Sequence, residues 1–178
     1  MTQKKYELLK NDTVTAPNGK TLYRIKSLIN FGVVVAGSLG GYIEKEDNLA
    51  HSGNAWVSDN AWVSGNARVY GDARVYGNAW VYGNAWVSDN AWVSGNARVF
   101  GDDDLVLFSK VGTEQGTLTV YKSKDGSLLA TRGCFSGTVD EFLAKSAEVH
   151  NERIQREYQL LIEVAKSRLL GESYVPTF

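Results

Sequence analysis

Gly53-Asn54-Ala55-Trp56-Val57-Ser58 opens a six-residue repeat that runs from about Gly53 to Asp102. Each unit has an alanine two places before a valine, and the valines recur without a break at 57, 63, 69, 75, 81, 87, 93 and 99. Because side chains alternate along a strand, alanine and valine share one face, and the tryptophan or arginine between them lies on the other. The Gly-Asn pair supplies a corner, since both residues tolerate left-handed backbone angles.

Two architectures use short strands separated by Gly-Asn. In an antiparallel meander with two-residue hairpins the turn needs glycine first, but Asp59-Asn60 and Asp89-Asn90 replace it. In a parallel β-helix every unit is one side of a coil, and small inner residues suit a narrow interior. The unit Val-x-Gly-Asn-Ala-x resembles the hexapeptide repeat of left-handed β-helix proteins, in which three units form one triangular coil. We therefore expect a mainly β protein, built on a left-handed parallel β-helix of about three coils.

Sequence of a different kind flanks the repeat, and we expect it to close both ends, because a short solenoid needs caps. The chain then divides into an N-terminal β-hairpin and cap (1–50), the β-helix (51–104), a β strand and hairpin (105–137) and two C-terminal α-helices (138–178).

The N-terminal flank predicts strands at 6–9 and 21–28, with a turn at Pro17-Asn18-Gly19. The glycine-rich segment 37–41 lacks the spacing of a dinucleotide fingerprint, and no helix pattern follows it. We expect it to be a turn that begins or caps the first coil.

The C-terminal flank predicts a strand at 105–108 and a hairpin over 117–132 that turns at Lys124-Asp125-Gly126. Thr138-Val139-Asp140-Glu141 has the pattern of a capping box and predicts a helix to about Val149.

A second helix is expected over 152–170, with Ile154, Tyr158, Leu161 and Ala165 on its apolar face. We expect that face to pack against the coil or a neighbouring subunit.

The composition limits the classes of partner and the location that can be expected. The 178 residues carry 19 basic and 20 acidic side chains, so the charge balance gives no reason to expect duplex nucleic acid or an anionic membrane as partner. No apolar run reaches the roughly 18 residues that span a bilayer, and the N-terminus lacks a secretory h-region. Cys134 is the one cysteine, so no intrachain disulfide can form, and a cytoplasmic location is expected.

The outward residues of the repeat form columns. With eighteen residues per coil, residues eighteen apart are expected to lie one above the other, which gives the columns Trp56–Arg74–Trp92, Trp62–Trp80–Arg98 and Arg68–Trp86. All five tryptophans are in these columns, and leaving every ring in water would exceed the apolar patch of a typical monomer. A neighbouring subunit, the flanks or a ligand must therefore cover some of them.

Two interpretations of the arginine–tryptophan columns stay open. The first is a stabilising surface ladder or a subunit contact, since stacked guanidinium and indole planes contribute about 0.5 to 1 kcal/mol when exposed. The second is a set of pockets for a flat, anionic ligand, because arginine forks suit phosphates and aromatic faces suit bases. The candidate ligand contacts are Arg68, Tyr70, Arg74, Trp80, Trp86 and Arg132.

The repeat contains an exact internal copy: residues 53–69 recur as residues 83–99, thirty positions later. Thirty is not a multiple of eighteen, so equivalent residues of the two copies are expected on different faces of the coil. This favours a scaffold or spacer role for the repeat.

The flanking motifs resemble a family of phage and prophage proteins that are often labelled hexapeptide-repeat or polymer-forming. The resemblance lies in Asn18-Gly19-Lys20-Thr21-Leu22-Tyr23-Arg24-Ile25, in Leu39-Gly40-Gly41-Tyr42-Ile43-Glu44 and in Thr131-Arg132-Gly133-Cys134-Phe135 with the helix after it. It implies phage origin, a β-helix and a homotrimer, and it implies no mechanism.

The sequence leaves three functions open. The first is a non-catalytic phage-encoded binding protein that sequesters a host nucleotide immune signal, by analogy with phage proteins of other folds. The second is a protein-binding or self-assembling scaffold, which open coil ends would favour.

The third function is a hexapeptide-type acyltransferase, which needs a histidine base. Only His51 and His150 are available, and the uninterrupted repeat offers no loop to hold a substrate. Cys134 has no nearby histidine in the sequence and is expected to be a buried thiol. No cluster of metal ligands is apparent and no cofactor is expected.

Overall fold

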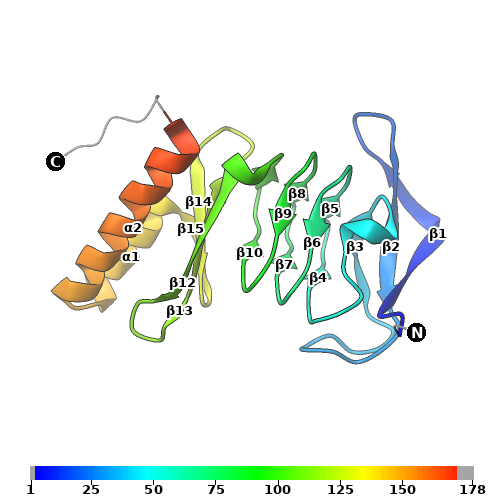
Figure 1. The fold of residues 1–178 in the computed structure, drawn as a ribbon, viewed down its shortest axis with the longest axis horizontal. Helices are drawn as coiled ribbons and strands as arrows, with labels where there is room; N and C mark the ends of the chain where they lie inside the picture. Colours follow the sequence, from blue (N-terminus) through cyan, green and yellow to red (C-terminus); the bar gives the residue numbers. More distant parts are fainter. Residues whose placement is uncertain (1–2, 172–178) are drawn as a thin grey trace.

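A computed structural model of the protein describes residues 3–171. Its parts follow one another in a row: an N-terminal sheet, the repeat, a C-terminal sheet and two helices (Figure 1). The repeat is a β-solenoid of about three turns, so the mainly β fold predicted from the sequence is confirmed.

Eight two-residue strands form the sides of the coil: β4 (Trp56–Val57), β5 (Trp62–Val63), β6 (Arg68–Val69), β7 (Arg74–Val75), β8 (Trp80–Val81), β9 (Trp86–Val87), β10 (Trp92–Val93) and β11 (Arg98–Val99). They stack in parallel, and every strand pairs with the strand eighteen residues away. The parallel pairing excludes the antiparallel meander and confirms the predicted columns.

The coil therefore has three faces, which we name by one tryptophan each. The Trp62 face consists of β5, β8 and β11, the Trp56 face of β4, β7 and β10, and the Trp86 face of β6 and β9. Every repeat alanine and valine points inward and is buried, and together they form one continuous core. Each buried valine contributes about 1.5 to 3 kcal/mol of apolar burial, and the parallel backbone ladder satisfies the strand amides.

The corners depend on left-handed backbone angles. Gly65, for example, has φ +64°, and a Cβ there would lie 3.2 Å from the backbone of Gly83 in the next coil. Asp59 and Asp89, which stand where other units have glycine, both have φ +56°. Aspartate is one of the few side chains that tolerate this angle, so the corner geometry survives the replacement.

The N-terminal flank is a hairpin that joins the coil. Strand β1 (Tyr6–Thr15) pairs antiparallel with β2 (Thr21–Ser27), and β2 pairs antiparallel with β3 (Leu39–Ile43). β3 then pairs in parallel with β5, so the N-terminal hairpin continues the sheet of the Trp62 face.

The expectation that 37–41 is a turn is wrong for its second half. Gly37 turns, with φ +93°, but Gly40 and Gly41 lie within β3. A Cβ on Gly40 would lie 2.5 Å from the carbonyl oxygen of Val57. Glycine is needed here because the strand passes so close to the next coil.

The first coil is two residues longer than the others. Leu49 bridges in parallel to Val69, twenty residues on, whereas Val57 pairs with Val75, eighteen residues on. The extra residues lie in the corner between Leu49 and Trp56, which contains His51. The short 3-10 helix η1 (Glu46–Asn48) precedes this corner.

The C-terminal flank closes the other end of the coil after a second 3-10 helix, η2 (Asp102–Asp104). Its antiparallel sheet has the order β12 (Leu105–Val111), β13 (Gly116–Lys122), β14 (Leu128–Arg132) and β15 (Phe135–Thr138). The hairpin was predicted, whereas β15 was not, because Phe135-Ser136-Gly137 is short and shows no clear alternation. Thr119 Oγ1 accepts the N–H of Trp92 at 3.2 Å, and Tyr121 Oη accepts that of Ser94 at 3.1 Å.

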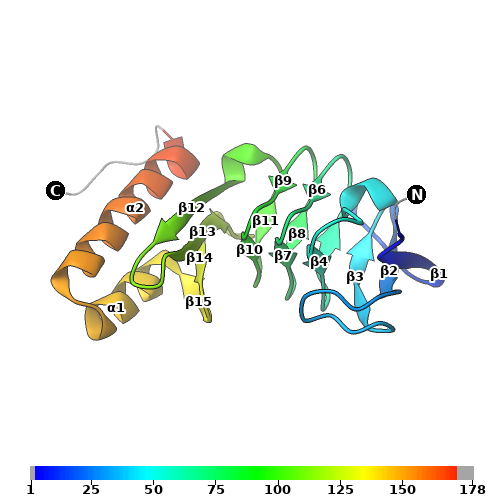
Figure 2. The same ribbon diagram turned by 60° about the horizontal axis from the view of Figure 1, so that its bottom comes forward.

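The helices α1 (Val139–Val149) and α2 (Glu152–Leu170) match the predicted ranges, and Thr138 and Glu141 form the predicted capping box. They pack on the C-terminal sheet, on the side that faces away from the coil (Figure 2). Of the two partners expected for the apolar face of α2, the coil is excluded, because the sheet lies between them and covers that face. Neither helix, nor any other within residues 3–171, is long and apolar enough to cross a membrane.

Candidate ligand-binding cleft

The outward side chains differ from face to face. On the Trp62 face, Trp80 stacks on Trp62 with ring centroids 4.5 Å apart and planes 5° apart. On the opposite side, the guanidinium carbon of Arg98 lies 4.0 Å from the Trp80 ring centroid. Arg98 is further held by hydrogen bonds from Nη1 to the carbonyl oxygens of Asn78 and Ala97. Both sides of the Trp80 ring are thus occupied within the protein.

On the Trp56 face the flank covers the first tryptophan. Phe31 and Tyr6 contact the Trp56 ring at centroid distances of 5.3 Å and 6.4 Å, and Trp56 is only 6% exposed. Further down, Arg74 lies over the ring of Trp92 at 5.4 Å. This face therefore also supplies its own partners.

The Trp86 face is different. Trp86 is 52% exposed, and its one ring contact among the described residues is an edge-on approach of Tyr70 at 6.1 Å. Arg68 pairs with Trp86 in register, yet its guanidinium does not stack on the indole. Within residues 3–171 the Arg68 side chain has no hydrogen bond or ion pair. An exposed indole and an unpaired guanidinium thus lie on neighbouring coils.

A cleft of about 400 Å³ lies between this face and the N-terminal cap. Its floor is the Trp86 face, and its wall is η1 with the long corner after it. The lining residues are Glu46, Asp47, Leu49, Ala50, His51, Arg68, Val69, Tyr70 and Trp86.

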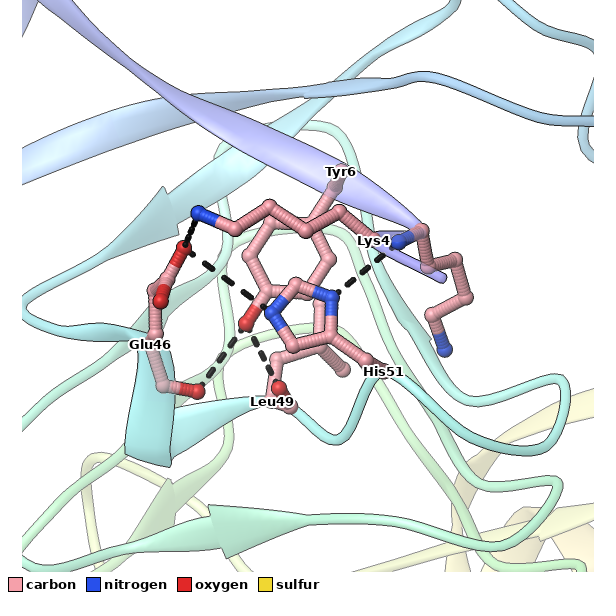
Figure 3. A network of polar contacts seen from close by, with 6 residues as sticks. Lys4, Tyr6, Glu46, Leu49 and His51 are labelled. Carbon is pink, nitrogen blue, oxygen red and sulfur yellow. Dashed lines mark hydrogen bonds and ion pairs between the residues drawn. The ribbon is translucent and has the colours of Figure 1, made fainter. Parts of the chain in front are cut away.

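The wall of the cleft is fixed by a polar network (Figure 3). The buried Tyr6 hydroxyl donates toward the carbonyl oxygens of Glu46 and Leu49, at 2.9 Å and 2.6 Å. Lys4 Nζ lies 3.1 Å from the Glu46 carboxylate. Burial, together with the charges of Glu46 and Asp47, raises the pKa of the Tyr6 phenol, so the hydroxyl remains a donor.

His51 stacks on Tyr6 with ring centroids 4.2 Å apart and planes 11° apart. Its Nδ1 accepts the backbone N–H of Lys5 at 3.1 Å, so the neutral ring carries its proton on Nε2. Nε2 is buried, has no hydrogen-bond partner, and lies 3.9 Å from a carboxylate oxygen of Glu46. Burial lowers the pKa of His51 below its ordinary value.

Lys5 fastens the same strand to the coil. Its side chain is buried, and Nζ donates to the carbonyl oxygens of Ala55 and Gly53 at 2.7 Å and 3.4 Å. Burial lowers the pKa of the Lys5 ammonium to about 8. The lysine thereby satisfies backbone carbonyl oxygens at the start of the coil, where no preceding coil within residues 3–171 is present to pair with them.

The structure brings together three of the six candidate contacts, namely Arg68, Tyr70 and Trp86. Arg74 lies on the Trp56 face and Trp80 on the Trp62 face, so neither reaches this cleft. Arg132 lies in β14, where Nη2 donates to the carbonyl oxygen of Val111 at 3.1 Å.

Sequence reasoning did not place Glu46, Asp47 or His51 at a site with Arg68. No local motif marks them, because the long corner of the first coil is what brings them there.

The other chemical candidates do not form a centre. Cys134 is exposed in the turn between β14 and β15, so the expectation of a buried thiol is wrong. His150 caps the end of α1, where Nδ1 lies 2.9 Å from the Ser146 hydroxyl. Among the described residues, no three metal-ligating side chains are close enough to hold an ion.

The stacked coils and the closed ends define the chain as a β-solenoid repeat protein. The family model of the YdcK beta solenoid repeat matches it four times in overlapping register, at residues 61–77, 67–83, 73–89 and 79–95. These matches lie wholly within the coil and leave both flanks uncovered. No curated protein matches the chain.

Proposed function

We propose that this protein is a non-catalytic binding protein, and that the cleft on its Trp86 face holds a flat, anionic small molecule, with a nucleotide as the best fit. The observation that carries the proposal is the exposed Trp86 beside an Arg68 whose side chain has no hydrogen bond or ion pair in the described part of the chain. An aromatic face offers about 1 to 3 kcal/mol per stacked base, and a guanidinium binds phosphate through paired N–H donors. The cleft volume also lies within the range of small-molecule sites.

We further propose that the ligand is a host nucleotide signal, which a phage protein of this kind would sequester by binding. This proposal rests on the resemblance of the flanking motifs to those of phage and prophage proteins. The homotrimer belongs to the same proposal, and its test is the mass of the protein in solution.

The geometry gives less support to the two alternatives. Fibre formation by end-to-end stacking needs open coil ends, and here the N-terminal hairpin and the C-terminal sheet cover them. Acyl transfer needs a histidine that is free to take a proton. His51 lines the cleft, but its Nδ1 is already an acceptor within the wall, which favours a structural role.

The test is recovery of a ligand. The purified protein is incubated with a lysate of infected, defence-competent bacteria, re-purified and denatured, and the released compounds are identified by mass spectrometry. The proposal expects a nucleotide at close to one per chain, and none from the Trp86→Ala variant. Protein that releases no small molecule, or a variant that releases as much as the wild type, would contradict it.

A further inference from the structure

The charges around the cleft are unusual for a nucleotide site. Of the described residues that line the cleft, Arg68 is the one cation, whereas Glu46 and Asp47 both place carboxylates on the wall. The Glu46 carboxylate is paired with Lys4 at 3.1 Å. Asp47 is exposed and makes no hydrogen bond or ion pair within residues 3–171. His51 adds no positive charge at neutral pH, because burial lowers its pKa.

The positions of these charges follow from the coil. Leu49 bridges to Val69, so η1 lies one coil above Arg68, and Trp86 lies one coil below. Neighbouring strands in a sheet are about 4.8 Å apart. Asp47 and Arg68 thus line the cleft from neighbouring coils, so a phosphate on the Arg68 guanidinium would approach the Asp47 carboxylate. A second or third negative charge on the ligand would meet the carboxylates of Glu46 and Asp47, of which that of Glu46 is paired with Lys4.

We propose that the cleft selects nucleotides whose phosphate is a diester, with a single negative charge, and rejects phosphomonoesters and polyphosphates. The inference rests on the proposed function and names the ligand class of that same site. Arg68 binds the single charge, Trp86 stacks the base, and Asp47 repels any additional charge. A phosphomonoester carries a charge of about −1.5 to −2 at pH 7, and a triphosphate carries more.

The test compares ligands that share one base. Cyclic AMP, AMP and ATP are titrated into the full chain by isothermal calorimetry at about 0.05 M salt, where charges are least screened. The inference expects cyclic AMP to bind at least about tenfold more tightly than ATP, with AMP between them, since like charges in contact are costly.

Two variants test whether Asp47 causes the preference for cyclic AMP over ATP. Asp47→Asn is expected to reduce the gap in affinity, which is the ratio of the Kd for ATP to the Kd for cyclic AMP, several-fold. Most of this change should come from tighter binding of ATP. Glu114→Gln removes one exposed carboxylate on the β12–β13 connection, far from the cleft, and is expected to leave the gap unchanged. The control separates a local effect from a change in net charge.

The outcomes distinguish a failure of the charge selectivity from a failure of nucleotide binding itself. If ATP binds as tightly as cyclic AMP, or if Asp47→Asn leaves the gap intact, the inference is overturned while the proposed function stands. If none of the three nucleotides binds, the proposed function itself is contradicted. A preference for cyclic AMP that Asp47→Asn reduces and Glu114→Gln does not would support both.

Discussion

Residues 53–69 and 83–99 have the same sequence, and the fold gives them different roles. Trp56, in the first copy, is 6% exposed beneath the N-terminal flank, whereas its equivalent Trp86 is 52% exposed in the cleft. Among residues 3–171 the Arg68 side chain has no hydrogen bond, ion pair or stacked ring, whereas its equivalent Arg98 stacks on Trp80 at 4.0 Å. The offset of thirty residues puts each equivalent pair on different faces of the coil.

The candidate site exists because of this offset. Arg68 lies near the end of the first copy and Trp86 near the start of the second, and the two are eighteen residues apart, one coil. Neither copy could form the cleft alone. A repeat therefore sets which residues are neighbours, and the flanks decide which of those neighbours remain exposed to a ligand.

The largest expected difference between the copies is in stability. Trp56→Ala removes a buried ring and is expected to lower the free energy of unfolding by about 3 to 5 kcal/mol. Trp86→Ala removes an exposed ring and is expected to change it by about 0.5 kcal/mol. Urea denaturation measures both. If Trp56→Ala does not fold, Trp56→Phe supplies the comparison with a smaller loss, and equal losses at 56 and 86 would contradict the account.

Substitutions of the equivalent arginines, Arg68 and Arg98, are expected to differ less in their effect on stability than those of Trp56 and Trp86. Arg98→Ala loses the stacking on Trp80 and the hydrogen bonds to Asn78 and Ala97, so a loss of about 1 to 2 kcal/mol is expected. Arg68→Ala should change stability by no more than about 0.5 kcal/mol. Thermal unfolding is the measurement, at roughly 2 to 4 °C per kcal/mol for a chain of this size. A larger effect at Arg68 would count against its being unpartnered.

The wall of the cleft, which contains His51, is expected to make the stability of the protein depend on pH. The folded pKa of His51 lies below its ordinary value of about 6.5, so below that pH the unfolded chain binds more protons. The contribution of His51 to the free energy of unfolding is therefore fully present above pH 6.5. It is lost as the pH falls through the lowered pKa of the folded state. Protonation of Nδ1 would also break the hydrogen bond from Lys5.

The measurement is urea unfolding between pH 7 and pH 5. His51→Asn is expected to flatten the pH dependence relative to the wild type. His150→Asn, which changes the histidine at the end of α1, should leave it in place. The account of the wall would be wrong if His51→Asn kept the full acid sensitivity.

The smallest expected difference concerns the corners. Asp89→Gly relieves a positive φ and is expected to raise stability by about 0.5 kcal/mol or less. Asp59→Gly should gain less, because Asp59 Oδ2 also accepts the N–H of Gly77 at 3.1 Å. The two glycine variants are compared by denaturation on one day and in one buffer. A greater gain at position 59 would show that the hydrogen bond contributes nothing.

The coil was predictable because its pattern is local. Alternation along a strand assigns Ala55 and Val57 to the interior, and the period of six assigns Trp62, Trp80 and Arg98 to one column. The capping box at Thr138 fixed the start of α1 by the same kind of short-range rule. Each of these features needs only residues a few places apart in the chain.

The exposed face was not predictable, because it depends on contacts between distant segments. Phe31 and Tyr6 cover Trp56 from the N-terminal flank, and nothing in the repeat indicates which tryptophan the flank covers. The longer first coil, which moves Glu46 and His51 to the edge of the cleft, breaks the period without any motif. Of the six residues proposed as contacts, three are gathered by the Trp86 face, and the other three lie elsewhere.

The most direct test of the account measures nucleotide affinity for the same two arginine variants. The probe is whichever of cyclic AMP, AMP and ATP binds the wild-type protein most tightly in calorimetry. Arg68→Ala is expected to lose at least about tenfold in affinity with its stability unchanged, because it removes a charge-assisted contact to phosphate. Arg98→Ala is expected to keep its affinity while its stability falls. Unchanged affinity in Arg68→Ala, or an equal loss in both variants, would contradict the claim that the Trp86 face is the binding face.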